Sequence, residues 1–431
     1  MKALPTLKPP TRAVVTGIAA TLTLLLLTSC AGGSSDTSDA DAANQVDKGY
    51  EYGASEAEIQ EALSDMEPVT LTYQPAATSA QDPVAPVATE FKEEVERISD
   101  GKITIDIVYA QAIVPFLEVP EALADGRLDI SMFPPIYLPS EYPEWNTPLI
   151  ATTQVPASPL VGEIAATAAL AEHWASSDEI KEEVASYGLA PLVLPEPTGP
   201  IVTICNEKVS EAEDLKGKLV RVSSQAQGDQ FSGMGATPLS LPSEEVYEGL
   251  QRGTADCAAV PYQSVVMLGL EEVAPHVSYT SEVSLARGPG LIATGSNVAD
   301  LPLAARQVLF DQAANKFVNG RIADMENLTT ATQRIQEAGG SVNELSEDAQ
   351  QKLEEVNDAL VAETQGDAVD TAVVELNESY DKWFNIASDL GFEDKGGFDN
   401  VHEWYSREDF DFEGLSDRIF EEIFLDLRPR E

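Results

Sequence analysis

The chain has 431 residues and a formal net charge of −47, because 73 Asp and Glu residues outnumber 26 Lys and Arg residues. Such a charge repels phosphate, so it excludes a nucleic-acid partner and docking on anionic lipid through a basic patch. Hydrophobic residues make up 43% of the chain, which excludes wholesale disorder, and the length predicts two or three domains. The chain has only three histidines, His173, His276 and His402, which disfavours a catalytic or metal site built on clustered imidazoles. No Walker-type loop or dinucleotide fingerprint is present, and we expect no cofactor.

Residues 1–29 have the features of a lipoprotein signal peptide. A basic start precedes the apolar segment Ala13–Leu27, which is too short to span a membrane comfortably. The segment runs into the letters LTSC, ending at Cys30, which are similar to a bacterial lipobox, where the cysteine is diacylated and the chain is cleaved just before it. We therefore predict lipidation of Cys30 and an extracytoplasmic protein on the outer face of the cell membrane, which it contacts through the lipid anchor only. An ordinary signal peptide with an incidental cysteine is the alternative.

Residues 30–66 are predicted to form a flexible tether and a short helix. From Ala31 to about Gly53 the chain is rich in Gly, Ser, Asp and Ala and has almost no large apolar side chains, so it cannot bury a core. Ser55 and Glu58 have the spacing of a capping box, which predicts a helix beginning there.

Residues 67–195 and 196–275 are each predicted to form an α/β lobe. In the first lobe, alternating apolar residues predict three strands with helices between them. Short connections in this β-α-β-α-β order predict a parallel sheet. The strands predicted for the first lobe are Val69–Tyr73, Ile103–Tyr109 and Leu128–Met132, and those predicted for the second are Ile201–Cys205, Lys218–Val222 and Ala255–Val260.

Helices dominate the rest of the chain. Leu160 to Tyr187 is predicted as one helical stretch, and residues 276–299 as strands that cross back between the lobes. Residues 300–390 are predicted to hold a long helix that braces both lobes, with Asp300 as its N-cap, and further helices. The acidic extension 391–431 carries many aromatic residues, which predicts packing onto the body.

Two cysteines remain besides Cys30. Because an exported protein meets an oxidising environment, Cys205 and Cys257 can form one disulfide. Two buried thiols on neighbouring strands are the alternative, and the spacing of the residues does not decide between them.

Several segments, in order, resemble the solute-binding proteins of tripartite ATP-independent periplasmic (TRAP) transporters, the dicarboxylate-binding-protein-like family. The resemblance covers about Pro68 to Leu390 and implies an α/β, two-lobed, periplasmic-binding-protein-like fold with a long bracing helix and a helical C-terminal region. The segments are EFKEEVERISDGKITIDI (Glu90–Ile107), EALADGRLDISM (Glu121–Met132), EDLKGKLVRVSS (Glu213–Ser224), GATPLSLPSEEVYEGLQRGTADC (Gly235–Cys257) and AGGSVNELSEDAQ (Ala338–Gln350).

The resemblance implies that the lobes close over a small organic anion and deliver it to membrane permease subunits driven by an ion gradient. Arg221 stands where the family has its central ligand-binding arginine, and a guanidinium fork matches a carboxylate. A strand arginine that faces solvent is the alternative. The other candidate ligand contacts in the two lobes are Tyr73, Met132, Phe133, Ser243, Tyr247 and Val260.

The expected cleft is less polar than is usual in the family, because Val260 replaces the family's Asn. An apolar wall cannot pair a second charge, which favours a monocarboxylate with an apolar or aromatic body over a C4-dicarboxylate.

Two other functions remain as alternatives, namely the binding lipoprotein of an ATP-driven importer and a secreted, lipid-anchored hydrolase. No Gly-x-Ser-x-Gly motif is present and no motif places a histidine beside a nucleophile, so we expect no catalytic residues. The acidic charge is spread over all segments, which favours a solvated surface over a site for a cationic ligand.

Overall fold

The computed structural model describes residues 48–430 with the exception of residues 83, 197 and 365. The predicted signal peptide, Cys30 and most of the predicted tether lie outside the described residues. Within the described part, no helix is both long enough and apolar enough to cross a membrane.

The first sheet has five strands, and its core is the predicted parallel unit. Strand β1 pairs in parallel with β2 on one side and with β3 on the other, and the connections are helices α2 (Ala85–Ile98) and α3 (Val119–Ala124). Strand β10 runs antiparallel to both β3 and β4, so the sheet is mixed. In spatial order the strands are β2 (Ile103–Ile107), β1 (Val69–Gln74), β3 (Ile130–Phe133), β10 (Gly290–Thr294) and β4 (Ala190–Glu196).

The second sheet has six strands. Strand β6 lies between β7 and β8 and runs parallel to both, whereas β5 is antiparallel to β8 and β9. In spatial order the strands are β11 (Ser341–Glu344), β9 (His276–Tyr279), β5 (Ile201–Cys205), β8 (Cys257–Pro261), β6 (Leu219–Val222) and β7 (Thr237–Ser240). The helices of this part are α7 (Gln225–Gly233), α8 (Val246–Gln251) and α9 (Gln263–Met267). The chain passes from the first sheet to the second after β4, returns after β9 and crosses to the second sheet again between β10 and β11. The fold therefore has the predicted two lobes.

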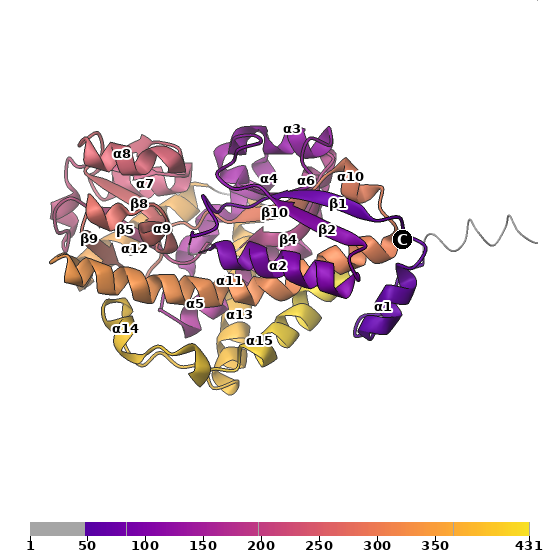
Figure 1. Cartoon of the computed structure of the whole chain (residues 1–431). Helices are drawn as coiled ribbons and strands as arrows, with labels where there is room; N and C mark the ends of the chain where they lie inside the picture. The colour runs from indigo at the N-terminus through magenta and orange to yellow at the C-terminus, as the bar shows by residue number, and fades with distance from the viewer. Residues whose placement is uncertain (1–47, 83, 197, 365, 431) are drawn as a thin grey trace, which may run out of the picture. The chain divides into compact units, whose positions relative to one another are not determined.

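Helix α11 (Leu303–Glu337) is the predicted long helix, and it runs past both sheets (Figure 1). At 1.5 Å per residue, its 35 residues span roughly 50 Å. The predicted N-cap is wrong, because Asp300 is the C-cap of the short helix α10 (Ser296–Ala299) and the N-cap of α11 is Pro302, with ψ 148°. A residue before proline avoids the α conformation, so the chain breaks the helix at Leu301 and starts again after Pro302.

The predicted helical stretch from Leu160 to Tyr187 is two helices, α5 (Val161–Ser176) and α6 (Asp178–Ser186). Ser177 separates them with ψ 115°, and its side chain accepts a hydrogen bond from the backbone N–H of Ile180. A serine that can cap the following helix favours this break.

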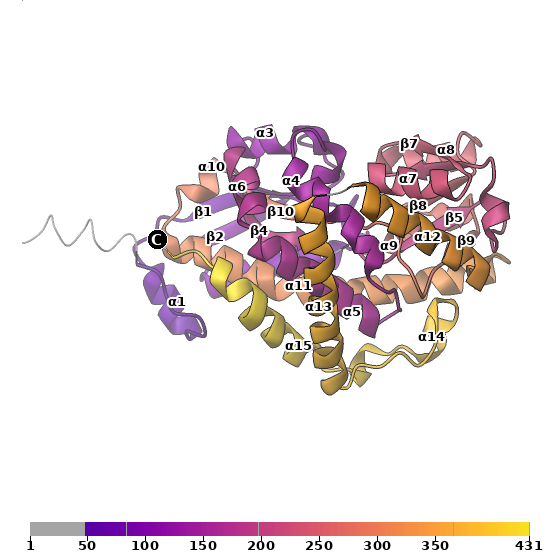
Figure 2. The ribbon, with the colours of Figure 1, turned by 180° about the vertical axis from the view of Figure 1, so that it is seen from behind.

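The aromatic C-terminal extension packs onto the body, as predicted. It follows helices α12 (Glu347–Glu363) and α13 (Asp367–Asp389), and it contains α14 (Val401–Trp404) and α15 (Phe412–Ile419). Helix α13 packs against α5, which it crosses in Figure 2, and α15 packs against α11. The buried rings of the extension are Phe392, Phe398, Phe412, Phe420 and Phe424.

The predicted tether is shorter than expected, because Tyr50 is fixed to the body. Its hydroxyl donates to Asp311 Oδ2 at 2.8 Å, and the guanidinium of Arg428 lies 4.7 Å from the centre of its ring. Arg428 in turn donates to both oxygens of Asp311, at 2.8 and 3.0 Å. Burial and the charge of Asp311 raise the pKa of the Tyr50 hydroxyl. The two ends of the described chain are therefore joined on α11. The predicted capping box of Ser55 and Glu58 is present at the start of α1 (Glu56–Ala62).

Candidate functional site

A cleft with about 790 Å³ of empty space, partly open to solvent, lies between elements of both lobes. Tyr73 and Met132 line it from the carboxyl ends of the parallel strands β1 and β3, and Gln263 lines it from α9, directly after β8. Thr198, in the first connection between the sheets, also contributes, and α11 forms another wall. Ligands of α/β proteins bind at the carboxyl ends of strands, so this cleft is the candidate binding site.

The walls of the cleft are largely apolar. Most lining residues are Ala, Val, Pro, Met, Ile or Phe, which supports the predicted shortage of polar contacts. The polar lining residues are Tyr73, Thr198, Gln263, Lys316 and Asp324. Pairing with Glu90 Oε2 at 3.3 Å compensates the charge of Lys316.

The structure brings two of the predicted contacts, Tyr73 and Met132, into this cleft. Phe133, the neighbour of Met132, is completely buried and packs against Tyr142 with ring centres 5.2 Å apart. Successive residues of a strand face opposite sides of the sheet, which explains why only one of the pair reaches the cleft.

The candidate contacts of the second lobe lie elsewhere on its surface or in its core. Val260 is 2% exposed within β8. The hydroxyl of Tyr247 on α8 donates to Glu272 Oε2 at 3.3 Å, and Ser243 begins a short 3-10 helix before α8. None of these three is among the residues that line the cleft described above.

Arg221 is buried inside the second lobe, with 2% of its surface exposed, so the solvent-facing alternative is wrong. Like the other three second-lobe candidates, Arg221 is not among the residues that line the cleft. Its Nε donates to the carbonyl oxygen of Leu241 at 2.9 Å, and its Nη1 donates to that of Ala259 at 3.1 Å. Its Nη2 is buried and has no hydrogen-bond partner. Strands β6, β7 and β8 are parallel, so their carboxyl ends lie at one edge of the sheet, and these contacts place the guanidinium there. Helix α9, which carries Gln263, follows β8 at the same edge.

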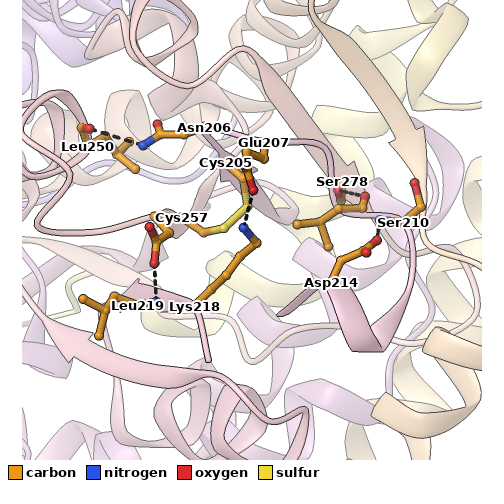
Figure 3. Close-up of a disulfide and its surroundings, with 12 residues drawn as sticks. Cys205, Asn206, Glu207, Ser210, Asp214, Lys218, Leu219, Leu250, Cys257 and Ser278 are labelled. Carbon is orange, nitrogen blue, oxygen red and sulfur yellow. Dashed lines mark hydrogen bonds and ion pairs between the residues drawn. A yellow bond between two sulfur atoms is a disulfide. The ribbon is translucent and has the colours of Figure 1, made fainter. Parts of the chain in front are cut away.

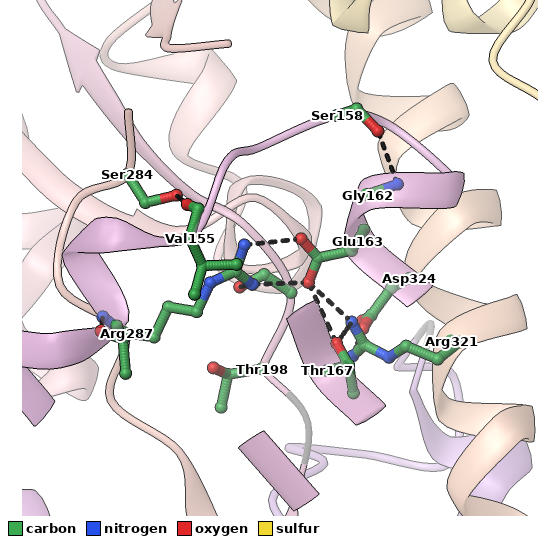
Figure 4. A network of polar contacts seen from close by, with 12 residues as sticks. Val155, Ser158, Gly162, Glu163, Thr167, Thr198, Ser284, Arg287, Arg321 and Asp324 are labelled. Atoms are coloured by element: carbon green, nitrogen blue, oxygen red, sulfur yellow. Dashed lines mark hydrogen bonds and ion pairs between the residues drawn. The ribbon is translucent and has the colours of Figure 1, made fainter. Parts of the chain in front are cut away.

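A buried network of charges connects the parts of the chain that join the lobes (Figure 4). Both oxygens of Glu163 on α5 accept from Arg287, at 2.7 and 2.9 Å. Oε1 of Glu163 also accepts from Arg321 on α11 at 3.2 Å, and Arg321 donates to Asp324. Arg287 lies in the connection from β9 to β10 and donates to the carbonyl of Gly199 in the other connection at 3.4 Å. One carboxylate thus links both connections and the long helix.

Neither this network nor four of the polar residues in the cleft, Thr198, Gln263, Lys316 and Asp324, were predicted from the sequence. Lys316 and Asp324 belong to α11, where polar residues on a long helix are usually assigned to solvent. The available signal was their spacing, because Lys316, Gly320 and Asp324 recur at intervals of four and share one helix face. Gln263 follows β8 by two residues, so the rule of strand ends indicates it as well.

Cys205 and Cys257 are joined by a disulfide (Figure 3). They are direct partners in the register of the antiparallel strands β5 and β8. Beside them, the backbone N–H of Leu219 donates to Asp256 Oδ2 at 2.8 Å and Lys218 pairs with Glu207 at 2.9 Å. In the described residues, no three His, Cys, Asp or Glu side chains are placed to hold a metal ion.

The fold has two α/β lobes, between whose sheets the chain passes three times, once through the long helix, and a cleft at the strand ends. These features define a two-lobed solute-binding protein. The chain belongs to the family described as "Bacterial extracellular solute-binding protein, family 7" (DctP), which matches residues 76–367. The predicted membership in the TRAP solute-binding proteins is therefore confirmed, and it disfavours both an ATP-driven importer and a hydrolase.

Solved structures show the same fold. A marine metagenome TRAP solute-binding protein specific for aromatic acid ligands, in complex with metahydroxyphenylacetate, has a TM-score of 0.63 and 21% identity, over 73% of this chain and 99% of its own. The ectoine-binding protein of the TeaABC TRAP transporter of Halomonas elongata has a TM-score of 0.62 and 19% identity, over 73% of this chain and 100% of its own. At these identities the likeness shows the fold alone.

Curated relatives match over shorter stretches. The ectoine-binding periplasmic protein TeaA of Halomonas elongata is 35% identical over 86 residues, which is 20% of this chain and 25% of TeaA. A solute-binding protein of Albidiferax ferrireducens is 26% identical over 187 residues, 43% of this chain and 52% of the relative. The chain thus matches a quarter and about half of the length of these two relatives.

Proposed function

We propose that the protein captures a small organic carboxylate outside the cytoplasm and delivers it, chemically unchanged, to the permease subunits of a TRAP-type transporter driven by an ion gradient. The observation that carries the carboxylate assignment is Nη2 of Arg221, which is buried without a partner. A buried donor left unpaired costs about 1–3 kcal/mol, and a ligand carboxylate would remove this cost. Family membership supports the transport role.

The preferred ligand is a monocarboxylate with an apolar or aromatic body. The apolar residues that line the cleft would pack against such a body but would leave a second carboxylate unpaired. A structural neighbour described as specific for aromatic acid ligands has the same fold, which agrees with this class. Tyr73 and Met132 are proposed to contact the body of the ligand, and Phe133, Ser243, Tyr247 and Val260 to shape or support the site.

A thermal-shift screen of the mature protein tests this function. The panel contains 3-hydroxyphenylacetate, 3-hydroxybenzoate, succinate as a dicarboxylate, and 3-hydroxyphenylacetamide as a neutral control of matched shape. A ligand at 100 times its Kd stabilises the folded state by about 2.7 kcal/mol, so we expect Tm to rise by roughly 5 °C with an aromatic acid. Equal responses to the acid and its amide, or a response to succinate alone, would contradict the proposed ligand class.

We further propose that the protein is a lipoprotein anchored through Cys30. The Cys30→Ser variant is expected to leave the membrane fraction or to remain uncleaved, because lipid attachment requires the thiol. Cell fractionation followed by immunoblotting measures this, and Ser35→Ala, five residues further along, is the matched control that should stay with the membrane. A Cys30→Ser protein that is processed and fractionates like the natural chain would rule out the anchor.

A further inference from the structure

Among the residues of helix α11 that line the cleft, Lys316, Gly320 and Asp324 share one face of the helix. They are four residues apart, so Lys316 and Asp324 are separated by about 12 Å along the helix axis. A Cβ atom placed on Gly320 would have no heavy atom within 4 Å, which shows that the space beside it is open. Side chains of a helix lean toward its N-terminus, so Asp324 leans toward the space that Gly320 leaves empty.

Asp324 is held in a fixed position. Its side chain is 9% exposed, and its Oδ2 accepts a hydrogen bond from Arg321. Arg321 is itself held by Glu163, and a Cβ on Gly199 would lie 3.6 Å from Asp324 Oδ2, so the connection between the lobes passes directly along this carboxylate (Figure 4). A carboxylate oriented in this way is a preorganised acceptor.

Two other polar side chains around the cleft, those of Lys316 and Gln263, are paired within the protein. Lys316 forms an ion pair with Glu90, and the side-chain nitrogen of Gln263 donates to the carbonyl of Thr198 at 3.3 Å. Among the residues that line this largely apolar cleft, Asp324 is the one that offers a carboxylate to a bound molecule.

We propose that Asp324 accepts a hydrogen bond from a hydroxyl or ammonium group of the ligand, so that the transported acid carries a donor at some distance from its carboxylate. This inference rests on the proposed function. An acid without the donor would cover Asp324 with apolar surface and shield its carboxylate from water without giving it a new hydrogen bond. Such an acid should therefore bind less tightly. Asp324 is thus a residue that determines specificity, whereas Arg221 is assigned to the carboxylate that all the acids share.

Isothermal titration calorimetry with a matched pair of acids, 3-hydroxyphenylacetate and phenylacetate, tests the assignment. The natural protein is expected to bind the hydroxy acid on the order of 10- to 100-fold more tightly, as a hydrogen bond to a charged group predicts. In Asp324→Ala the ratio is expected to fall below about threefold through loss of affinity for the hydroxy acid. Glu326→Ala removes an exposed carboxylate from the same helix and should leave the ratio unchanged.

Gly320→Leu provides a second variant that spares the contact between Asp324 and Arg321. It narrows the open space beside Asp324 and improves the helix propensity of α11, so it is expected to fold and to lose affinity for the hydroxy acid. The inference is overturned if Asp324→Ala still prefers the hydroxy acid over phenylacetate as strongly as the natural protein does. If Asp324→Ala does not fold, the same result in Gly320→Leu overturns it. In either case the proposed function would still hold. If neither acid binds the natural protein, both the inference about Asp324 and the proposed ligand class are overturned.

Discussion

Glu163→Gln is expected to lower the free energy of unfolding by about 3–5 kcal/mol, because it removes the charge that compensates two buried arginines. The side chains of Glu163 and Arg287 are 5% and 4% exposed, so water cannot replace the lost carboxylate. Arg321 keeps Asp324 as a counter-ion, but Arg287 keeps only neutral acceptors, namely the amide oxygen left by the substitution and the carbonyl of Gly199. A buried cation without a counter-ion is among the most destabilising outcomes of a single substitution.

Urea unfolding followed by tryptophan fluorescence measures this effect, since Trp174 is buried on the same helix as Glu163. Glu248→Gln is the matched control, because Glu248 pairs with Arg252 at 2.9 Å on the surface and its loss should change stability by less than about 0.5 kcal/mol. Equal stability of the two variants would show that the network does not hold the lobe connections together.

Replacing both Cys205 and Cys257 with alanine is expected to cost about 4 kcal/mol of stability. The disulfide closes a loop with a sequence separation of 52, and a cross-link of that length restricts the unfolded chain by about this amount. Reduction of the natural protein should lower Tm to that of the double variant, and the reductant should not change the Tm of the double variant further.

Alkylation without reductant, followed by peptide mass analysis, provides the control for the disulfide. We expect no modified thiol at Cys205 or Cys257 in the exported protein, and full modification after denaturation and reduction. Complete alkylation of both residues without reductant would contradict the bond that joins β5 to β8.

The sequence predicts the local elements of this fold well and the long-range polar contacts poorly. Ser55 and Glu58 form a capping box with their own side chains, and apolar and polar residues alternate along Val69–Tyr73 as in a strand. Both elements can therefore be predicted from neighbouring residues alone. Tyr50 is different, because its partners Asp311 and Arg428 come from distant parts of the chain. A local composition rich in Gly and Ser therefore suggested a tether where tertiary contacts in fact fix the chain.

The same distinction applies to the site. Tyr73 and Met132 were predictable, because the resemblance to a known family indicated this wall of the cleft and because parallel strands end at one edge of a sheet. The role of Asp324 was not predictable, because it depends on a contact between Glu163 and Arg321. These two residues are far apart in the sequence, and their spacing does not indicate that they meet. The resemblance to a known family indicated Arg221, but only the structure shows that its guanidinium is buried with one nitrogen unpaired.

The carboxylate of the ligand is proposed to bind the guanidinium of Arg221, and calorimetry with the best acid from the thermal-shift panel tests this contact. Arg221→Lys keeps the charge but loses the planar fork, so binding should weaken, and Arg221→Ala should weaken it further, by about 2–5 kcal/mol. Arg252→Ala, which removes an arginine whose side chain is 71% exposed, should bind like the natural protein. If a folded Arg221→Ala variant binds the acid as tightly as the natural protein does, the assignment is wrong and the carboxylate binds elsewhere.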